Sequence, residues 1–440
     1  MEQLILQSVR LIWTYFTIPL LLAVSCFYTF YLGGVQFKFL KMIRALTTKS
    51  ENRSTVTPMQ SLFMALAAKV GVGSLAGVAL AISIGGPGSI FWMRISTFLT
   101  TAASFAESTL AQIFKRRDQG RFIGGPAFYI RYGLNNKWIA ALYAIIILLT
   151  YTFGFSAVQT NTIAASFEST LQMAPFVTGI LLSVVTALIL LGGAAGITQL
   201  VSKLVPIIAF FYISMGLFAL FTHLDFVGTF FQTIIADAFN VSSLLGGGLM
   251  VGLQRGIFSN EAGLGSGAHA ASMTDSERPT QQGYIQAFGV YLTTLVVITI
   301  TAFMLMVTGA PSMAGQLGNG IQLTQYAMNS LFGPLGNYLL TLSIFFFGFS
   351  TIPTAYFYGE SNIRFLTKKP EAIWVLRILV VVTVFVSSIT SSTFLWSLVD
   401  LGTGTTATIN LIALIGLASQ VKRALNFEKT HQNLSSCKNS

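Results

Sequence analysis

Long apolar segments separated by short polar ones dominate this chain, which is the pattern of a helical membrane protein. The first segment, 11–32, holds 22 uncharged residues, enough for a helix to cross a bilayer. It has no small-residue cleavage site with a basic lead-in, so we expect a retained helix and not a signal peptide. Ten similar segments follow: 61–83, 88–113, 138–165, 176–195, 201–222, 242–262, 283–309, 336–358, 373–393 and 404–421. The pattern predicts an all-α polytopic fold with eleven transmembrane helices.

Basic residues gather in every second polar segment. If the N-terminus lies outside, 22 of the 25 Lys and Arg residues fall on the cytoplasmic side. They lie in 38–53 (Lys49 and Arg53 included), in 115–137, at Lys203, Arg255 and Arg278, in 364–377, and in the tail from Lys422. Asp225, Asp237 and Asp400 fall in the outer loops. This positive-inside pattern predicts a bacterial-type plasma membrane protein with a cytoplasmic C-terminus. The polar tail, 422–440, is expected to be disordered.

Composition narrows the class further. Hydrophobic residues make up 53% of the chain and charged residues 9%. Two cysteines cannot form a disulfide framework, and three scattered histidines do not indicate a metal cluster. The net charge of +11 follows the topology described above and does not indicate binding to nucleic acid. The expected surroundings are a lipid bilayer.

One predicted span is interrupted by glycines within 69–77. Gly71 and Gly73 allow the backbone to unwind, and the β-branched Val70 and Val72 weaken the helix between them. Unsatisfied peptide groups are costly in lipid, so unwound backbone persists only where it lines a cavity. There its free amides attract a carboxylate and its free carbonyls coordinate a small cation. Close helix packing through the small residues is the alternative.

A second interruption covers the polar stretch 255–266. Gly252 lies just before this stretch, and Gly256 lies near its start. Asn260 offers donors and an acceptor to an amino acid head group, and Phe258 offers an apolar wall. Two interrupted spans at matching places in two halves of a chain indicate the substrate and ion site of a secondary transporter.

Charged side chains also fall inside or beside the spans. Glu107 lies in an otherwise uncharged helix, where a lipid-facing carboxylate would cost about 2.5–3.5 kcal/mol, so it should point inward. It either pairs with a base or relays protons. Glu261 either binds a cation or pairs with Arg255 or Lys69.

Two uncharged polar groups complete the pattern. The patch 159–162 begins with Gln159 and either contacts a solute or joins helices. Ser350 and Thr351 offer hydroxyl oxygens to a hard cation such as Na⁺, unless they bond back to their own helix.

Together these segments resemble the alanine/glycine:cation symporter family of sodium-coupled amino acid transporters. The family-like motifs cover nearly the whole chain: ALAAKVGVGSLAGVALAISIGGPGSIFWM, FAESTLAQIF, IGGPAFYIRYGL, FYGE and the most specific block, RGIFSNEAGLGS. The family has the LeuT-type fold. The resemblance implies inverted five-helix repeats at 61–222 and 242–421, after an extra helix and basic loop in 1–60 and before a cytoplasmic tail, 422–440.

The resemblance also implies the site residues. Carbonyls and hydroxyls would bind Na⁺ at Ala67, Val70, Phe347, Ser350 and Thr351. The amino acid would be surrounded by Gly71, Gly73, Ser74, Gln159, Phe258, Asn260 and Ala355.

Two of these positions depart from the family pattern. Ser74 stands where the family usually has Asn, which shortens a polar contact near the carboxylate or the ion. Ala355 stands where the family usually has Trp, one helical turn after Thr351 and on the same face. A missing indole enlarges the pocket. We therefore expect a neutral amino acid larger than glycine or alanine, such as glutamine.

The predicted function is Na⁺ symport of a small neutral amino acid by alternating access. Lys69, beside the expected cation site, either replaces a second sodium or indicates proton coupling. H⁺ symport with Glu107 or Glu261 titrating is the alternative. An intramembrane enzyme would need clustered catalytic groups, and a channel would need a filter; the sequence offers neither. The pattern predicts no oligomeric state.

Overall fold

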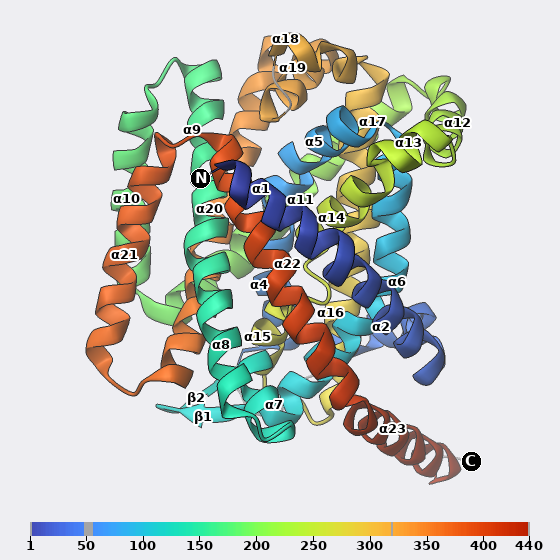
Figure 1. Cartoon of the computed structure of the whole chain (residues 1–440), viewed down its shortest axis with the longest axis vertical. Helices are drawn as coiled ribbons and strands as arrows, with labels where there is room; N and C mark the ends of the chain where they lie inside the picture. Colours follow the sequence, from blue (N-terminus) through green and yellow to red (C-terminus); the bar gives the residue numbers. More distant parts are fainter. Residues whose placement is uncertain (1, 48–55, 318–319, 439–440) are drawn as a thin grey trace.

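The computed structural model describes residues 2–47, 56–317 and 320–438, and these form a bundle of helices with one small hairpin (Figure 1). Lys49 and Arg53, included in the charge pattern above, lie outside the described residues. The first half contains α1 (Glu2–Ile12), η1 (Trp13–Thr17), α2 (Ile18–Tyr31), η2 (Val35–Phe37), α3 (Phe39–Thr47), α4 (Pro58–Lys69), η3 (Val72–Ser74), α5 (Ala76–Gly85), α6 (Gly88–Phe114), β1 (Arg116–Asp118), β2 (Arg121–Ile123), α7 (Pro126–Gly133), α8 (Lys137–Ile147), η4 (Leu148–Phe155), α9 (Ser156–Leu171), α10 (Pro175–Leu191) and α11 (Gly193–Thr222).

The second half contains α12 (Phe226–Ala238), α13 (Val241–Gly246), α14 (Gly248–Asn260), α15 (Ser266–Ser272), α16 (Pro279–Tyr291), η5 (Leu292–Ile298), α17 (Thr299–Val307), η6 (Ala310–Met313), α18 (Ala314–Leu317), α19 (Ile321–Phe332), α20 (Pro334–Leu366), α21 (Pro370–Ser388), α22 (Ser392–Gly416) and α23 (Ala418–Lys438). Of the short η segments, η1, η4 and η5 are π-helical and the others are 3₁₀ turns.

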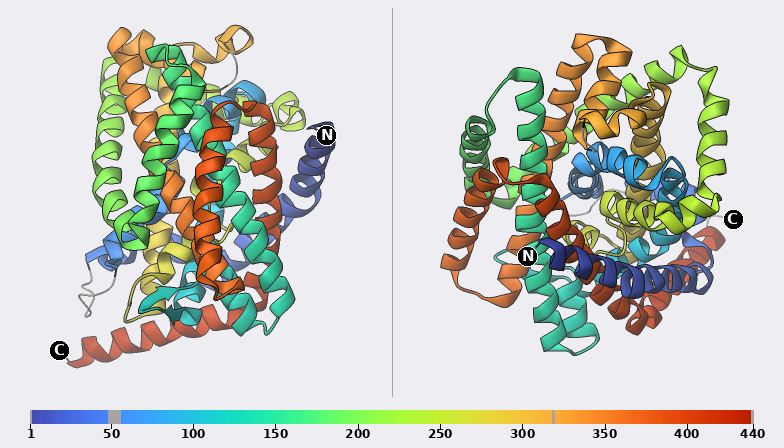
Figure 2. Two further views of the ribbon diagram at one scale, coloured as in Figure 1. Left: turned by 90° about the vertical axis from the view of Figure 1, so that its left-hand side faces the viewer. Right: turned by 45° about the horizontal axis from the view of Figure 1, so that its top comes forward.

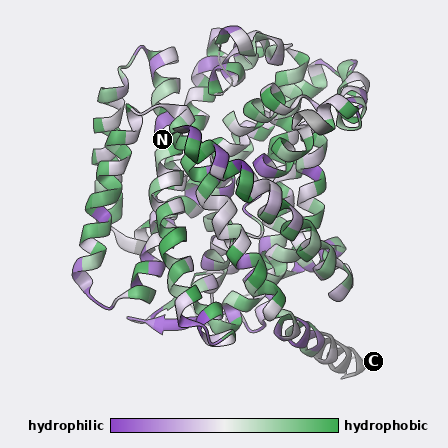
Figure 3. Ribbon diagram, in the orientation of Figure 1, coloured by the Kyte–Doolittle hydropathy of each residue, from purple (hydrophilic) through white to green (hydrophobic). Residues whose placement is uncertain are grey.

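Seven helices within the described residues are long and apolar enough to cross a membrane: 3–31, 137–171, 195–222, 279–307, 334–366, 370–388 and 392–416. On the outside of the bundle, α10 and α21 are rich in hydrophobic residues, whereas the hairpin β1–β2 is hydrophilic (Figure 3). Exposed apolar side chains on these helices, such as Phe176 and Trp374, suit contact with lipid. The structure is thus the predicted all-α polytopic membrane protein; the total of eleven spans and the division into repeats stay predictions.

Helix α6 is buried along most of its length and packs against α14, α15 and α16. Two glycines of α14 allow this close contact: a Cβ on Gly252 would lie 2.5 Å from the Ser89 carbonyl oxygen, and one on Gly256 would lie 2.5 Å from Ser96 Oγ. The glycines before the second interruption therefore serve packing within a continuous helix. The helix itself breaks after them, at 261–265.

The two ends of the bundle differ. One end, called the hairpin face here, carries β1–β2, α7 and α23, and α23 runs across it (Figures 1 and 2). The other end, called the opposite face, carries α12, α18 and α19. Strand β1 pairs antiparallel with β2, with Arg117 opposite Phe122.

Two predictions near the C-terminus were wrong. Helix α22 begins at Ser392, twelve residues before the predicted start at 404, so Asp400 lies inside a helix and not in an outer loop. The prediction failed because a carboxylate in this segment was interpreted as a loop signal. The tail, expected to be disordered, forms α23 as far as Lys438.

Candidate functional site

The first interrupted span is broken in the structure, as predicted. Helix α4 ends at Lys69, Gly71 is extended (φ −86°, ψ −159°), a single 3₁₀ turn follows, and α5 begins at Ala76. Peptide groups released from the helix find side-chain partners: the Val72 N–H donates to Gln159 Oε1 at 2.9 Å. On the other side, the Thr301 hydroxyl is 3.0 Å from the Ser74 carbonyl oxygen. Because buried peptide groups need partners, these polar residues stabilise the break.

Helix α20 brings hydroxyl oxygens to the end of α4. Thr351 Oγ1 lies 2.7 Å from the Ala67 carbonyl oxygen and 2.9 Å from that of Phe347. Ser350 Oγ is 2.9 Å from the Phe347 carbonyl oxygen as well. Four of the five predicted Na⁺ ligands thus lie together. The fifth, Val70, directly follows α4, and its N–H still donates to the Leu66 carbonyl at 2.7 Å.

Two glycines let these groups approach the unwound backbone. A Cβ on Gly71 would lie 2.8 Å from both Gln159 Oε1 and Thr351 Oγ1, and one on Gly73 would lie 2.6 Å from the Phe258 ring. Any side chain at either position would displace one of these neighbours. The oxygens from α9 and α20 and the ring from α14 therefore meet at one short stretch of backbone.

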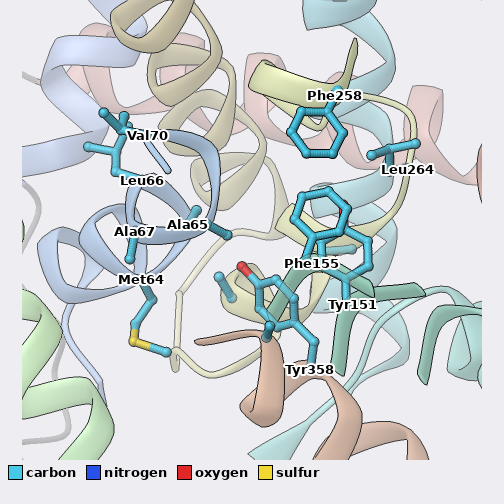
Figure 4. Packing of buried hydrophobic residues seen from close by; sticks show 14 of the residues in the cluster. Met64, Ala65, Leu66, Ala67, Val70, Tyr151, Phe155, Phe258, Leu264 and Tyr358 are labelled. Atoms are coloured by element: carbon cyan, nitrogen blue, oxygen red, sulfur yellow. The ribbon is translucent and has the colours of Figure 1, made fainter. Parts of the chain in front are cut away.

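Aromatic rings cover this stretch on the side of the opposite face. Phe258 stacks on Phe155 with a centroid distance of 4.7 Å, and Trp396 of α22 lies 4.9 Å from Phe258. In Figure 4, Phe258 and Phe155 face each other across from Ala67 of α4 and Val70, which follows α4. Such offset and tilted pairs hold their rings in a defined place.

The second break lies directly after Asn260, where Glu261 adopts a left-handed conformation (φ 55°) and the chain resumes a helix at Ser266. Asn260 Oδ1 accepts from the Ala262 N–H at 3.0 Å, so this side chain caps the turn. The Ser74 and Ser259 hydroxyls, 2.8 Å apart, connect the two breaks.

Ala355, the remaining predicted substrate residue, is fully buried on α20. Its carbonyl oxygen lies 3.3 Å from Thr152 Oγ1 of η4. It stands one turn after Thr351, as the sequence indicated. Its role in pocket size stays a prediction.

The charges near the breaks pair differently from the sequence expectation. Glu107 points inward and is fully buried, which confirms that prediction. Arg255, assigned to a cytoplasmic segment and considered as a partner of Glu261, is instead buried in α14 and bonds to Asp400 Oδ2 at 2.5 Å. Its guanidinium also lies 4.8 Å from the centre of the Trp396 ring.

Two cavities lie at opposite ends of the bundle. One of about 930 Å³ reaches Arg255, Trp396 and Asp400 from the opposite face. One of about 430 Å³ lies under the hairpin and reaches Phe357 and Glu360. Among the described residues, neither lining includes Gly71, Gly73, Ser350 or Thr351. The unwound residues Gly71 and Gly73 and the hydroxyls beside them therefore lie outside both linings.

Sequence reasoning missed several residues of this centre. Thr301 and Trp396 carry no local signal, because their roles depend on which helices meet at the break. Asp400 did carry one: it is the single acidic residue between Glu371 and Glu428. A lone carboxylate in an apolar segment indicates a buried partner as much as a loop.

Comparison with known proteins shows the family and the fold of this chain. The profile of the "Sodium:alanine symporter family" matches residues 1–438. The chain is 39% identical over 422 residues to the "Probable sodium/glutamine symporter GlnT" of Bacillus subtilis, covering 94% of this chain and 88% of that protein. It is 33% identical to the "Sodium/alanine symporter AgcS" of Methanococcus maripaludis, covering 93% of each.

Its fold is similar to that of MhsT, solved with L-phenylalanine, at a TM-score of 0.58 and 12% identity, covering 86% of this chain and 99% of that one. This likeness confirms the predicted LeuT-type fold. The chain therefore belongs to the sodium:alanine symporter family and is a multi-pass membrane transporter.

Proposed function

We propose that this transporter imports a neutral amino acid together with Na⁺. The proposal rests on two neighbouring hydrogen bonds. The Thr351 hydroxyl contacts the Ala67 carbonyl oxygen, and the Val72 N–H donates to Gln159 Oε1. This arrangement supports binding of a cation by the oxygens and of a carboxylate by the amides of a single helix break. The names of the similar proteins, a sodium/glutamine and a sodium/alanine symporter, support the same assignment.

Na⁺ would bind among the carbonyls of Ala67, Val70 and Phe347 and the hydroxyls of Ser350 and Thr351. Hard cations prefer such oxygen donors. In the structure, the Thr351 hydroxyl has one hydrogen and two carbonyls within reach. When Na⁺ binds, this hydrogen would turn away from Ala67 so that an oxygen lone pair faces the ion. The ion would then join α4 to α20.

The amino acid would bind on the other side of the break. Its carboxylate would accept hydrogen bonds from the backbone amides around Gly71 and Gly73, and Gln159 would release the Val72 N–H to make room. Phe258 would cover the side chain. Ser74 and Asn260 would complete the polar wall, with Ser74 held by Ser259.

Ala355 sets the proposed size of the substrate. Its methyl group leaves more room beside Thr351 than an indole would. We assign the pocket to neutral amino acids of the size of glutamine, the amino acid in the name of the Bacillus subtilis relative.

Transport would proceed by alternating access between the two cavities. The charge pattern assigns the hairpin face to the cytoplasm and the opposite face to the outside. On the outer side, Phe258, Trp396 and the Arg255–Asp400 pair separate the cavity from the breaks. At about 100 mV, one charge contributes roughly 2.3 kcal/mol, and a tenfold Na⁺ gradient adds about 1.4 kcal/mol. One Na⁺ could thus concentrate its substrate several-hundredfold.

Uptake of labelled amino acids into proteoliposomes tests the proposal. An inward Na⁺ gradient should drive accumulation of glutamine and similar neutral amino acids, and its collapse at fixed pH should abolish accumulation. Exclusion of every neutral amino acid larger than alanine would overturn the size assignment. Accumulation that ignores Na⁺ and follows a pH gradient would overturn the choice of ion.

A further inference from the structure

Arg94 is a single charged residue in a long uncharged part of the chain. Between Lys69 and Glu107, it is the only residue with a charged side chain. It lies in α6, six residues after that helix begins at Gly88. At 1.5 Å per residue, Arg94 is about 9 Å from this end of the helix. A charge inside a span is costly unless it finds a partner, so the contacts of Arg94 decide how it is retained.

The Arg94 guanidinium has one hydrogen-bond partner within the described residues: its Nη2 donates to Thr299 Oγ1 of α17 at 3.0 Å. It forms no ion pair with them. A guanidinium carries five N–H donors. None of its other nitrogens is both enclosed and unpartnered in this part of the chain. The remaining donors therefore reach the surface of the bundle.

Two rings of α12 flank this guanidinium. Its carbon Cζ lies 5.8 Å from the centre of the Phe230 ring and 5.5 Å from the centre of the Phe231 ring. Such cation–π contacts favour a positive charge at this place but supply no negative one. The guanidinium is thus held between α6, α12 and α17 and keeps N–H donors for an anion.

The surface beside Arg94 is apolar and belongs to the opposite face (Figure 1). Helix α12 is a short apolar helix, on which Phe231 and Ile235 are 44% and 50% exposed. Trp92, two residues before Arg94, donates from its indole to the Ala238 carbonyl oxygen at 3.3 Å. Trp is typical of the boundary between lipid tails and head groups. Arg94 therefore lies at the level where head groups meet the bundle.

The acidic residues near α12 do not pair with Arg94. Asp237 Oδ2 accepts from the Gly88 N–H at 2.7 Å and lies 3.3 Å from Ser243 Oγ. Asp225, which directly precedes α12, is exposed and forms no ion pair with the described residues. An acceptor for the remaining N–H groups of Arg94 would therefore come from outside the chain.

We propose that Arg94 and Thr299 bind the phosphodiester group of a phospholipid in the leaflet next to the opposite face. The planar guanidinium matches two phosphate oxygens at once. The Thr299 hydroxyl accepts from Arg94 and keeps its own hydrogen for a phosphate oxygen. The acyl chains would run over the exposed side chains of Phe231 and Ile235. Basic pockets between membrane helices bind lipid head groups by the same chemistry.

The bound phospholipid would join three helices that surround the start of α5. It would connect Arg94 of α6 and Thr299 of α17 beside the rings of α12. Helix α12 also holds the turn between α5 and α6, through the bond from the Gly88 N–H to Asp237. The lipid would thereby stabilise this side of the bundle. Its binding depends on neither the proposed ion nor the proposed amino acid, so it is tested separately from the proposed function.

Native mass spectrometry of the purified protein tests the site. The protein is released from detergent with phosphatidylglycerol, or with diacylglycerol, which has the same chains and no phosphate. The wild type should retain one phosphatidylglycerol at collision energies that remove other lipids, and no diacylglycerol. Arg94→Gln should lose this retained lipid, and Arg94→Lys should keep it at lower occupancy. Arg10→Gln, which changes an exposed arginine of α1, should keep it fully.

Thermal melts separate a lipid from a free anion and show which variants are folded. Short-chain phosphatidylglycerol should raise the Tm of the wild type and not that of Arg94→Gln, and inorganic phosphate should raise neither. Equal stabilisation of the wild type by inorganic phosphate would overturn the lipid assignment. Equal retention of diacylglycerol by the wild type would overturn it too, whether or not any variant folds. Full retention of phosphatidylglycerol by folded Arg94→Gln would mean that Arg94 only packs against the rings of α12.

Discussion

The hydroxyl of Thr351 lies 2.7 Å from the carbonyl oxygen of Ala67, although 284 residues separate them in the sequence. This contact joins the last turn of α4 to the middle of α20. It is the shortest of the contacts that bring the proposed Na⁺ ligands together. Substitution of Thr351 is therefore the most direct test of the proposed Na⁺ site.

Thr351→Ala should weaken the Na⁺ dependence of transport. Loss of a charge-oriented oxygen ligand is worth about 1.5–3 kcal/mol, which corresponds to roughly a tenfold to hundredfold higher Na⁺ concentration for half-maximal uptake. Thr351→Ser should keep most of the wild-type dependence. Thr383→Ala on α21, whose hydroxyl bonds within its own helix at 2.8 Å, is the matched control. Unchanged Na⁺ dependence in Thr351→Ala would exclude this ligand.

Gln159→Ala should lower amino acid affinity while Na⁺ dependence remains. The change leaves the Val72 N–H without its partner and removes an amide from the proposed pocket. A hydrogen bond of about 1 kcal/mol corresponds to roughly a fivefold higher KM. Gln172→Ala, at the exposed end of α9, should leave KM unchanged. A rise in the Na⁺ requirement with an unaltered KM would contradict the assignment.

Gly71→Ala should abolish transport without unfolding the protein. The new methyl group would lie 2.8 Å from Gln159 Oε1 and Thr351 Oγ1, in the space proposed for the ligands. Gly228→Ala on α12, where a Cβ meets nothing within 4 Å, should transport normally. Thermal melts and uptake measured on the same preparations separate the two effects. Wild-type uptake by Gly71→Ala would mean that no ligand approaches this backbone.

Ala355→Trp should shift the preference toward small substrates. The indole would fill the room beside Thr351, so uptake of glutamine should fall much more than uptake of alanine or glycine. Competition of each amino acid against labelled alanine measures this change. An equal loss for all substrates would indicate a general packing defect and not a specificity role.

Arg255→Met should destabilise the protein more than the double variant Arg255→Met/Asp400→Leu. Removing one partner of a buried ion pair leaves an uncompensated charge and costs about 3–5 kcal/mol, whereas replacing both can be nearly neutral. Thermal melts of the two single variants and the double variant measure the difference. Simple additivity of the two single effects would show that the pair does not act as a unit.

Much of the fold could be predicted from the sequence because spans and their interruptions are local signals. Gly71 and Gly73 marked the first break correctly, and Glu107 pointed inward as its cost in lipid required. Pairings across the bundle could not be predicted. Arg255 lies within one helix and Asp400 within another, and only their packing reveals that they meet. The second break, at 261–265, lies within the predicted stretch 255–266, whereas Gly252 and Gly256 serve contact with α6 and not unwinding.

The extended residue Gly71 separates two short helices that have different neighbours. Helix α4 packs on α11, α15, α16 and α20, whereas α5 packs on α6, α14 and α19. Only the segment from Val70 to Leu75 connects the two helices. One helix can therefore change its orientation while the other keeps its packing contacts. In the proposed alternating access, one side of the break could then open while the helix packing on the other side is kept.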